Sequence, residues 1–498
     1  MLRQVIKISS GSSLGKLLGL FREILFASFF GTTSTADAYR AAFTTTLSSN
    51  LLISETLASA FVPLFRQDRE TNARRAWSLF NGLGVLLILL SIAIGAVLYV
   101  GAWTWVTWIF PGFSGERLEL TVYMLQVMAI GMPFYTASSI LINLMMAASD
   151  FHLTSIRAFV QNIGVIIALI IAFLWGRPVW IAWGFTGTYL IFFVYGIGWL
   201  LKSGILESGW YRHWVDLRSV AKRFWTAVRP LAFLSVLVQG NILLEKAIAS
   251  LIGPGAVATI DYARLIPETM QVLVVVPIGL VSLAAMGNFK DEEVRERTDR
   301  ISAMILLVLI PLSGFVLVAA PSLIRLLYAR GAFDEASVIQ TSQALRGMAV
   351  GMWAFCLAYV LQKIYNARMR NREVLRIAGI AVLANAIFNL VFYRHLGLLA
   401  IGLGFSLGGI VMTWFYVRGM GGLDRTRQIA WMTLLAAAPY ALIGFLLSQY
   451  GSVPLLDLSV QIVWAVIFWF TVLGSFPLSR QLLRQFSKRL ISVRTPDP

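Results

Sequence analysis

Ionisable side chains occur inside apolar stretches of this sequence, where a membrane-spanning helix ordinarily carries none. Lys16, Arg22 and Glu23 stand in the first such stretch, and Arg40 and Glu55 stand in the second. Lys16 and Glu23 are seven residues apart, which places them on one face of a helix, and Arg22 lies on the flank of that face. Because an ionised group near the centre of a bilayer costs about 2.5–3.5 kcal/mol, these groups are expected to face a partner or a water-filled cavity.

A similar set of charges recurs in the second half of the chain, namely Glu245, Lys246, Asp261, Arg264 and Glu268. Guanidinium offers a planar fork of donors that matches the oxygens of a phosphate group. Arg22 and Arg264 are therefore the strongest candidate ligands for an anionic substrate, and Lys16 and Arg40 are further candidates.

Acidic side chains in the same stretches could adjust the charge of such a site or bind a coupling cation. These candidate carboxylates are Glu23, Asp37, Glu55, Glu245 and Asp261. Transport would then draw on Na⁺, H⁺ or the membrane potential, and no bound cofactor is expected. The alternative interpretation is structural, because Arg22 with Glu23, or Glu245 with Lys246, could neutralise each other between neighbouring helices.

Metal chemistry and enzymatic catalysis are not expected from this sequence. Its single cysteine, Cys356, cannot form an internal disulfide, and its three histidines, His152, His213 and His395, are scattered rather than clustered as metal ligands are. A membrane enzyme such as a lipid-linked glycosyltransferase would need a large extracytoplasmic loop with acid or base residues. The loops on that side are short, so no catalytic residue is predicted.

The composition is that of an integral membrane protein. Hydrophobic residues make up 58% of the 498 residues and charged residues only 13%. A helix needs about 20 apolar residues to cross the hydrocarbon core, and lipid cannot satisfy an open strand edge. An all-α polytopic protein with about fourteen spans is therefore predicted. These spans are 5–30, 38–64, 78–102, 121–147, 155–176, 178–201, 228–251, 260–287, 301–324, 337–362, 374–393, 397–417, 429–448 and 457–478.

The net charge of +17 indicates membrane orientation rather than a nucleic-acid partner, because no basic soluble face is present. Basic clusters fill alternate loops; the first two are Arg66, Arg69, Arg74 and Arg75, then Lys202, Arg212, Arg218, Lys222 and Arg223. The loops of the other side carry only Arg117, Arg177, Arg325, Arg330 and Arg394. The positive-inside rule places the basic side and both termini in the cytoplasm, and no removable signal peptide is expected at the N-terminus.

An internal duplication divides the predicted helices. Asp37 and Arg40 recur as Asp261 and Arg264, and Glu23 falls opposite Glu245. A repeat of six spans points both copies the same way through the membrane, and two such lobes are expected to enclose a binding site. The predicted divisions are an N-lobe at 1–201, a cytoplasmic linker at 202–227, a C-lobe at 228–420, a helix pair at 421–479 and a basic cytoplasmic tail at 480–498.

Several motifs resemble the MurJ (MviN) lipid II flippase family of the multidrug/oligosaccharidyl-lipid/polysaccharide exporter (MOP) superfamily. They are Gly19-Leu20-Phe21-Arg22-Glu23, Phe30-Gly31, Ala36-Asp37-Ala38-Tyr39, Ala60-Phe61-Val62-Pro63-Leu64-Phe65, Tyr262-Ala263-Arg264-Leu265 and Leu327-Tyr328-Ala329-Arg330-Gly331-Ala332-Phe333-Asp334. The resemblance covers all fourteen predicted spans.

The resemblance implies a MurJ/MATE-like fold in the bacterial inner membrane and outward flipping by alternating access of an undecaprenyl-pyrophosphate-linked saccharide, for peptidoglycan or exopolysaccharide synthesis. Arg22 and Arg264 would contact the pyrophosphate, and Lys16 stands where the family usually has arginine. The expected partners are a polyprenyl-pyrophosphate-linked glycan and membrane lipids, and the expected state is a monomer.

The sequence departs from the family in its second span. Leu47-Ser48-Ser49-Asn50 and Ile53-Ser54-Glu55 replace the family's L-P-N-L-L-R-R and E-G-x-F segments. A cavity arginine of the family is therefore missing here. Its absence favours a different lipid-linked oligosaccharide, such as an exopolysaccharide repeat unit, over lipid II as the substrate. The remaining alternative is a cation-coupled small-molecule antiporter of the MATE type, with Glu23, Asp37 or Glu55 as its ion site.

Overall fold

The structure is a computed structural model of the chain, and it describes residues 2–214, 217–275, 290–448, 454–477 and 479–481. Within these residues the protein is helical and contains no strand. Contacts divide it into two compact units, which are described separately. Unit 1 comprises Met1–Ala258 and Arg330–Phe333, and unit 2 comprises Thr259–Ala329 and Asp334–Pro498.

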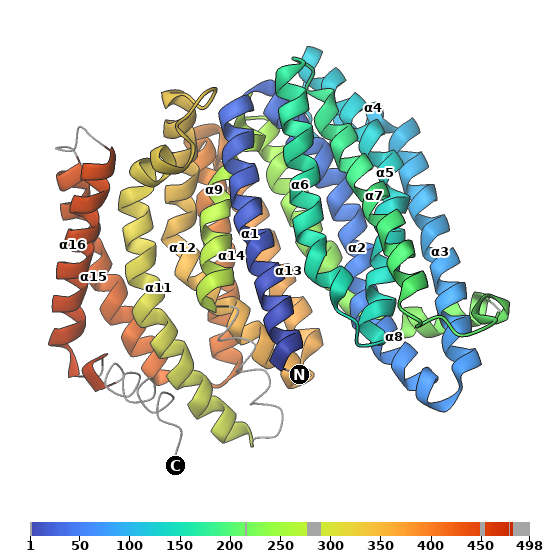
Figure 1. Cartoon of the computed structure of the whole chain (residues 1–498). Coiled ribbons are helices and arrows are strands. Elements are labelled where there is room, and N and C mark those ends of the chain that lie inside the picture. The colour runs from blue at the N-terminus through green and yellow to red at the C-terminus, as the bar shows by residue number, and fades with distance from the viewer. Residues whose placement is uncertain (1, 215–216, 276–289, 449–453, 478, 482–498) are drawn as a thin grey trace. The chain divides into compact units, whose positions relative to one another are not determined.

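Unit 1 is formed by eight α-helices and a short 3₁₀ turn (Figure 1). They are α1 (Leu2–Phe30), α2 (Ser34–Thr71), α3 (Ala73–Val100), α4 (Ala102–Ile109), α5 (Gly115–Ala147), α6 (His152–Leu174), α7 (Val179–Lys202), the 3₁₀ turn η1 (Trp210–Arg212) and α8 (Leu217–Ser250). Helix α9 (Ala256–Met270) begins in this unit and continues into unit 2.

The described residues of unit 2 form the rest of α9, a short π-helical segment that follows it and, from Asp291 onward, six long helices. These elements are η2 (Gln271–Val275), α11 (Asp291–Tyr328), α12 (Glu335–Ala367), α13 (Asn371–Leu396), α14 (Leu398–Gly419), α15 (Asp424–Ser448) and α16 (Pro454–Ser475). The last two helices pack against α11. The predicted basic tail at 480–498 lies outside the described residues, apart from its first two positions.

Most of the predicted spans coincide with these helices to within several residues at each end, but α8 and α11 begin well before the predicted spans 228–251 and 301–324. Eleven helices among the described residues are long and apolar enough to cross a membrane. Three predicted spans are not in that set. The spans 5–30 and 38–64 fall on the charged helices α1 and α2. The third is 260–287, of which 276–287 lies outside the described residues. The polytopic all-α fold is confirmed, whereas the count of fourteen stays a prediction.

The same packing order appears in both units. Helix α5 packs on α3 and α7 in unit 1, and α12 packs on α11 and α14 in unit 2; α6 packs on α7 as α13 packs on α14. Helix α8, the predicted counterpart of α1, packs on α2 and α3 of unit 1. The boundary between the two units falls after Ala258. The division into an N-lobe, a linker, a C-lobe, a helix pair and a tail stays a prediction.

Local signals explain where the helices begin. Thr33 caps α2 by accepting from the Ala36 amide at 3.4 Å, and Asn72 caps α3 in the same manner. Asp334 caps α12 and accepts from both the side chain and the amide of Ser337, at 2.7 and 2.8 Å. Hydrogen bonds from Ser337 hold the pKa of Asp334 below its usual value.

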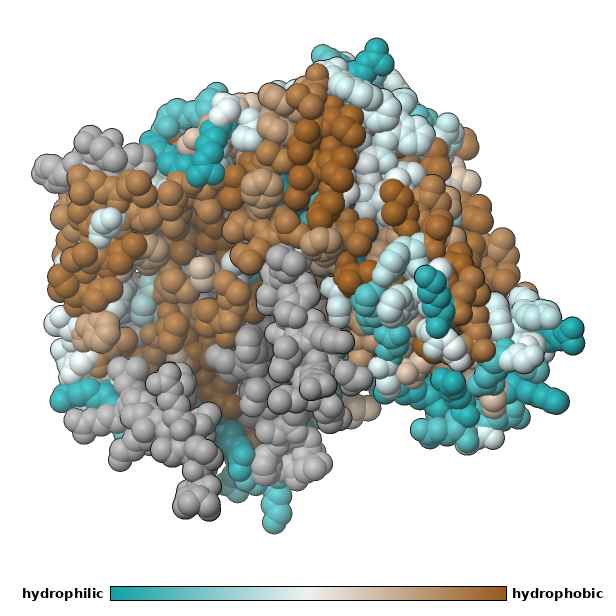
Figure 2. All heavy atoms as spheres, viewed as in Figure 1, coloured by the Kyte–Doolittle hydropathy of each residue, from teal (hydrophilic) through white to brown (hydrophobic). Residues whose placement is uncertain are grey.

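The outer surface of the helices suits a lipid solvent. Large apolar side chains such as Val100, Trp108 and Phe470 are exposed rather than buried. Figure 2 shows apolar side chains covering the middle of the helices on the face in view, while hydrophilic side chains gather toward helix ends. Such extensive apolar exposure is expected of a surface that contacts lipid.

Candidate functional site

The position of α1 within unit 1 is set by its contact with α6. The Asn162 side-chain amide donates to the Gly15 carbonyl oxygen at 2.9 Å. A β-carbon added at Gly15 would lie only 2.6 Å from the Ala158 β-carbon, so the absence of a side chain allows this close approach. The contact turns Glu23 into the unit, where it is buried, and leaves Lys16 exposed.

Three charged residues of α1 and α2 form a compact cluster around Glu23. Arg22 donates to Glu23 Oε1 at 2.5 Å, and Arg40 donates to both oxygens of the same carboxylate. Arg40 also lies over the ring of Phe26, with 4.6 Å between its guanidinium carbon and the ring centre. Two guanidinium groups thus share one carboxylate, and the cluster retains a positive charge.

The members of this cluster differ in their accessibility to a ligand. The side chain of Arg22 is 24% exposed, whereas that of Arg40 is 7% exposed. Arg22 can therefore contact a ligand, while Arg40 is occupied in holding Glu23. The cluster also fits the structural interpretation of Arg22 with Glu23, because a buried carboxylate requires such partners.

Arg157 of α6 is a charged residue that the sequence reasoning missed. It donates to the Tyr135 hydroxyl at 2.6 Å and lies over the same ring at 5.0 Å. Tyr189 contacts the Tyr135 ring and lies within electrostatic reach of both Arg157 and Arg22. Arg157 pairs with no carboxylate among the described residues, so its charge is available to an anion. Arg157 stands near the start of the predicted span 155–176, and only its charge could have marked it in the sequence as a functional residue.

Asp37 forms a second buried cluster with Arg117. Arg117 donates to Asp37 at 3.3 Å, and the backbone amides of Gly255 and Ala258 donate to the same carboxylate at 2.7 and 2.9 Å. Gly255 immediately precedes α9 and Ala258 lies in its first turn, so Asp37 caps that helix from a distant part of unit 1. Arg117, predicted to stand in an outer loop, is buried in the first turn of α5. Coupling of an ion at Asp37 stays a prediction.

The buried charges of α8 are also occupied within unit 1. Glu245 accepts a hydrogen bond from the Asn241 side chain at 2.8 Å, and Lys246 donates to the hydroxyl of Thr44 on α2. Both residues are almost fully buried. They help to hold α8 on α2, and a role for Glu245 in coupling stays a prediction.

The remaining candidates are distributed along α2 and α9. In unit 2, Asp261 and Arg264 are half-buried on α9, and the guanidinium carbon of Arg264 lies 5.8 Å from the ring centre of Phe405 on α14. The side chain of Glu55 lies outside the described residues. Arg22, Glu23 and Arg40 are therefore brought into contact, while Asp37 and Glu245 belong to separate clusters of unit 1.

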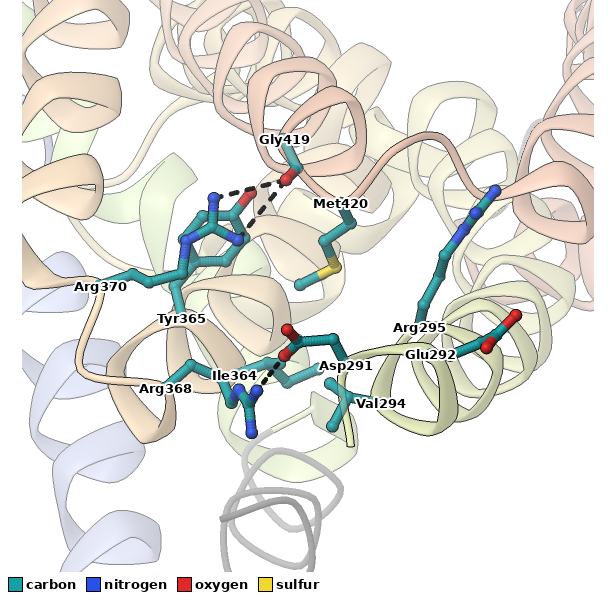
Figure 3. Close-up of a pocket in the computed structure, with 10 residues that line it drawn as sticks. All are labelled: Asp291, Glu292, Val294, Arg295, Ile364, Tyr365, Arg368, Arg370, Gly419 and Met420. Atoms are coloured by element: carbon teal, nitrogen blue, oxygen red, sulfur yellow. Dashed lines mark hydrogen bonds and ion pairs between the residues drawn. The ribbon is translucent and has the colours of Figure 1, made fainter. Parts of the chain in front are cut away.

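A pocket of about 650 Å³ opens in unit 2 between the first turn of α11 and the ends of α12 and α14 (Figure 3). Figure 3 shows Arg368 reaching Asp291, while Arg370 lies over the Tyr365 ring and points to the Gly419 carbonyl oxygen. Arg368 and Arg370 already have carboxylate partners, Asp291 and Glu373, and the third arginine of the lining, Arg295, donates to the Gly422 carbonyl oxygen at 3.2 Å. These pairs leave this pocket less suited to an anion than the cluster around Arg22.

Comparison with known proteins identifies related sequences. The model of the family described as "Lipid II flippase MurJ" matches residues 26–473. A "Probable lipid II flippase MurJ" of Rhizobium tropici is 27% identical over 80% of this chain and 77% of that protein. A protein of the same description from Vibrio cholerae is 24% identical over 90% of this chain and 89% of its own length.

Solved structures share the fold. A structure described as "Lipid II flippase MurJ, inward closed conformation" matches with a TM-score of 0.81 and 19% identity, over 96% of this chain and all of the other. An inward-facing MATE family transporter of the MOP superfamily matches with a TM-score of 0.71 and 13% identity, over 86% of this chain and 98% of the other. The predicted MurJ/MATE-like fold is confirmed.

Proposed function

The chain belongs to the lipid II flippase MurJ family, and from this we propose that it carries a polyprenyl-pyrophosphate-linked saccharide from the cytoplasmic to the outer leaflet. The substrate is lipid II or a related lipid-linked oligosaccharide, and the route is alternating access. The protein acts as a transporter rather than an enzyme, as a monomer with both termini in the cytoplasm.

The observation that carries this proposal is the excess positive charge of unit 1 around Arg22. Arg22 and Arg40 share the single carboxylate of Glu23. Arg157 lies on α6, which packs on α1, and it pairs with no carboxylate among the described residues. A pyrophosphate needs several charge-assisted hydrogen bonds to replace its water, and guanidinium supplies them in pairs. Arg264 of unit 2 stays a predicted ligand of the head group.

The membrane potential can drive this movement without a bound cofactor. A negative head group that leaves a negative-inside cell gains about 2.3 kcal/mol per charge per 100 mV if the charge crosses the full potential. The protein then needs only to supply a path for the head group. Coupling to Na⁺ or H⁺ is the alternative source of energy.

The function is tested with purified protein in liposomes that contain a fluorescent polyprenyl-pyrophosphate saccharide. Exposure of the saccharide on the opposite leaflet, at a rate well above that of protein-free liposomes, is the expected result. Lipid II and an exopolysaccharide repeat unit are compared as substrates in parallel. Drug efflux coupled to a cation gradient, without any saccharide flipping, would instead establish the MATE-type antiporter.

Arg157→Ala is expected to lower the flipping rate by roughly tenfold, since it removes one charge-assisted contact to the pyrophosphate. The rate is measured in the liposome assay at equal protein density. Tyr135→Phe is the matched control, because it removes the hydroxyl partner of Arg157 and keeps the ring. If Arg157 only anchors Tyr135, Arg157→Ala and Tyr135→Phe will slow flipping equally. If Arg157 binds the substrate, a third variant, Arg157→Lys, will retain more activity than Arg157→Ala.

A further inference from the structure

A second pocket, of about 600 Å³, opens in unit 1 where the start of α3, the η1 turn and the first turns of α8 meet. Its basic lining residues are Arg74, Arg75, Arg212, His213 and Arg223, and no carboxylate lines it among the described residues. In the sequence these residues belong to two basic clusters more than a hundred positions apart, which signal membrane orientation. The fold brings both clusters to one pocket.

The walls of this pocket are held by specific contacts. The Asn81 side-chain amide donates to the carbonyl oxygens of Trp210 and His213, at 2.9 Å each, and so attaches the η1 turn to α3. The Trp210 ring packs against the rings of Trp77 and Phe80 on α3, with centroids 6.0 and 5.9 Å apart. The basic residues of the turn are therefore positioned before any ligand arrives.

The buried carboxylate of Asp68 pairs with two of the arginines that line the pocket. Arg223 forms two hydrogen bonds with Asp68, at 2.5 and 2.9 Å, and Arg75 lies 3.7 Å from the same carboxylate. Within the described chain, Arg74 and Arg212 form no ion pair. Two of the four guanidinium groups of the pocket, those of Arg75 and Arg223, thus share a single carboxylate. Four guanidinium groups against one paired carboxylate leave a formal excess of three positive charges at the pocket.

We propose that this pocket binds a phosphate group, with Arg74 and Arg212 as its principal ligands. The remaining charge of Arg75 adds long-range attraction. Tyr211 and Trp214 are exposed beside the pocket, as aromatic side chains are at the level of lipid head groups. The source of the phosphate is an anionic phospholipid of the cytoplasmic leaflet or a soluble phosphate compound.

This site is separate from the charges around Arg22, so it does not depend on the transported substrate. A ligand in the pocket would contact α3, the η1 turn and α8 at once. Binding there would hold the first turns of α8 against α3. We therefore expect the ligand to raise the thermal stability of the protein.

The test measures the melting temperature of the full chain in nanodiscs of phosphatidylcholine, with and without phosphatidylglycerol. A second arm adds inorganic phosphate to phosphatidylcholine nanodiscs, against chloride at equal ionic strength. In one of these two arms, the wild-type protein should melt at a higher temperature with the added phosphate compound than without it. A rise with phosphatidylglycerol alone assigns a lipid head group, and a rise with inorganic phosphate assigns a soluble ligand.

The double variant Arg74→Gln with Arg212→Gln should lose most of this rise, and its apparent affinity for the effective ligand should fall by roughly tenfold or more. Neither side chain pairs with a carboxylate among the described residues, so the fold should tolerate the change. The matched control is Arg372→Gln with Arg376→Gln, which removes two exposed arginines of α13 that pair with no carboxylate among the described residues. No rise in either arm, or an equal loss in both double variants, overturns the proposal.

Discussion

Arg22→Ala and Arg264→Ala are each expected to abolish flipping of the lipid-linked saccharide. A hydrogen bond to a charged group contributes about 1.5–3 kcal/mol, and each arginine can offer two such bonds to a pyrophosphate. Loss of Arg22 also removes the excess charge of its cluster, because Arg40 and Glu23 then neutralise each other. The measurement is the rate of saccharide exposure in liposomes, with protein density determined for each variant.

Two companion variants separate charge from geometry at this position. Arg22→Lys keeps the charge but loses the planar fork, so partial activity is expected. Glu23→Gln keeps the shape of the cluster and raises its positive charge, so substrate should bind at least as tightly as in the wild type. Wild-type rates in both Arg22→Ala and Arg264→Ala would show that these arginines do not hold the head group.

Asp37→Ala is expected to destabilise the protein by about 3–5 kcal/mol, the usual cost of removing one partner of a buried ion pair. The change leaves Arg117 buried without its carboxylate and frees the amides of Gly255 and Ala258 at the start of α9. The melting temperature of the purified protein should fall clearly. Asp37→Asn retains one acceptor oxygen and should fall less.

The same pair of variants decides between the structural and the ion-coupling interpretation of Asp37. A capping role predicts that activity falls in step with stability, and that Asp37→Asn is the milder change in both assays. An ion-coupling role predicts that Asp37→Asn melts like the wild type yet no longer flips substrate. Activity measured well below the melting temperature of each variant keeps the two effects apart.

Sequence patterns predicted the helices because hydropathy is a local property. A run of apolar residues must form a helix in lipid whatever it packs against, so the spans predicted at 155–176 and 178–201 match α6 and α7 closely. The cap at Thr33 follows from one side chain and the next turn of backbone. The short helix α4 was not predicted as a separate element, because it follows α3 within one apolar run.

The charged groups of α1 and α2 were recognised from the sequence alone, because an ionisable residue in an apolar stretch is conspicuous wherever its partner lies. Arg22 and Glu23 were correctly paired as neighbours. Arg157 was missed, because a single arginine near a span end is common and only its contact with Tyr135 marks it. The roles of these residues in transport stay predictions.

Only the tertiary structure decided which distant charges meet. Arg40 reaches Glu23 across 17 residues, Arg117 reaches Asp37 across 80 and Arg223 reaches Asp68 across 155. Composition and periodicity determined that this chain lies in a membrane and where its helices run, because both depend on neighbouring residues. The pairing of charges, and the joining of two basic loops into one pocket, depends on how helices pack, because side-chain contacts form only after distant segments are brought together.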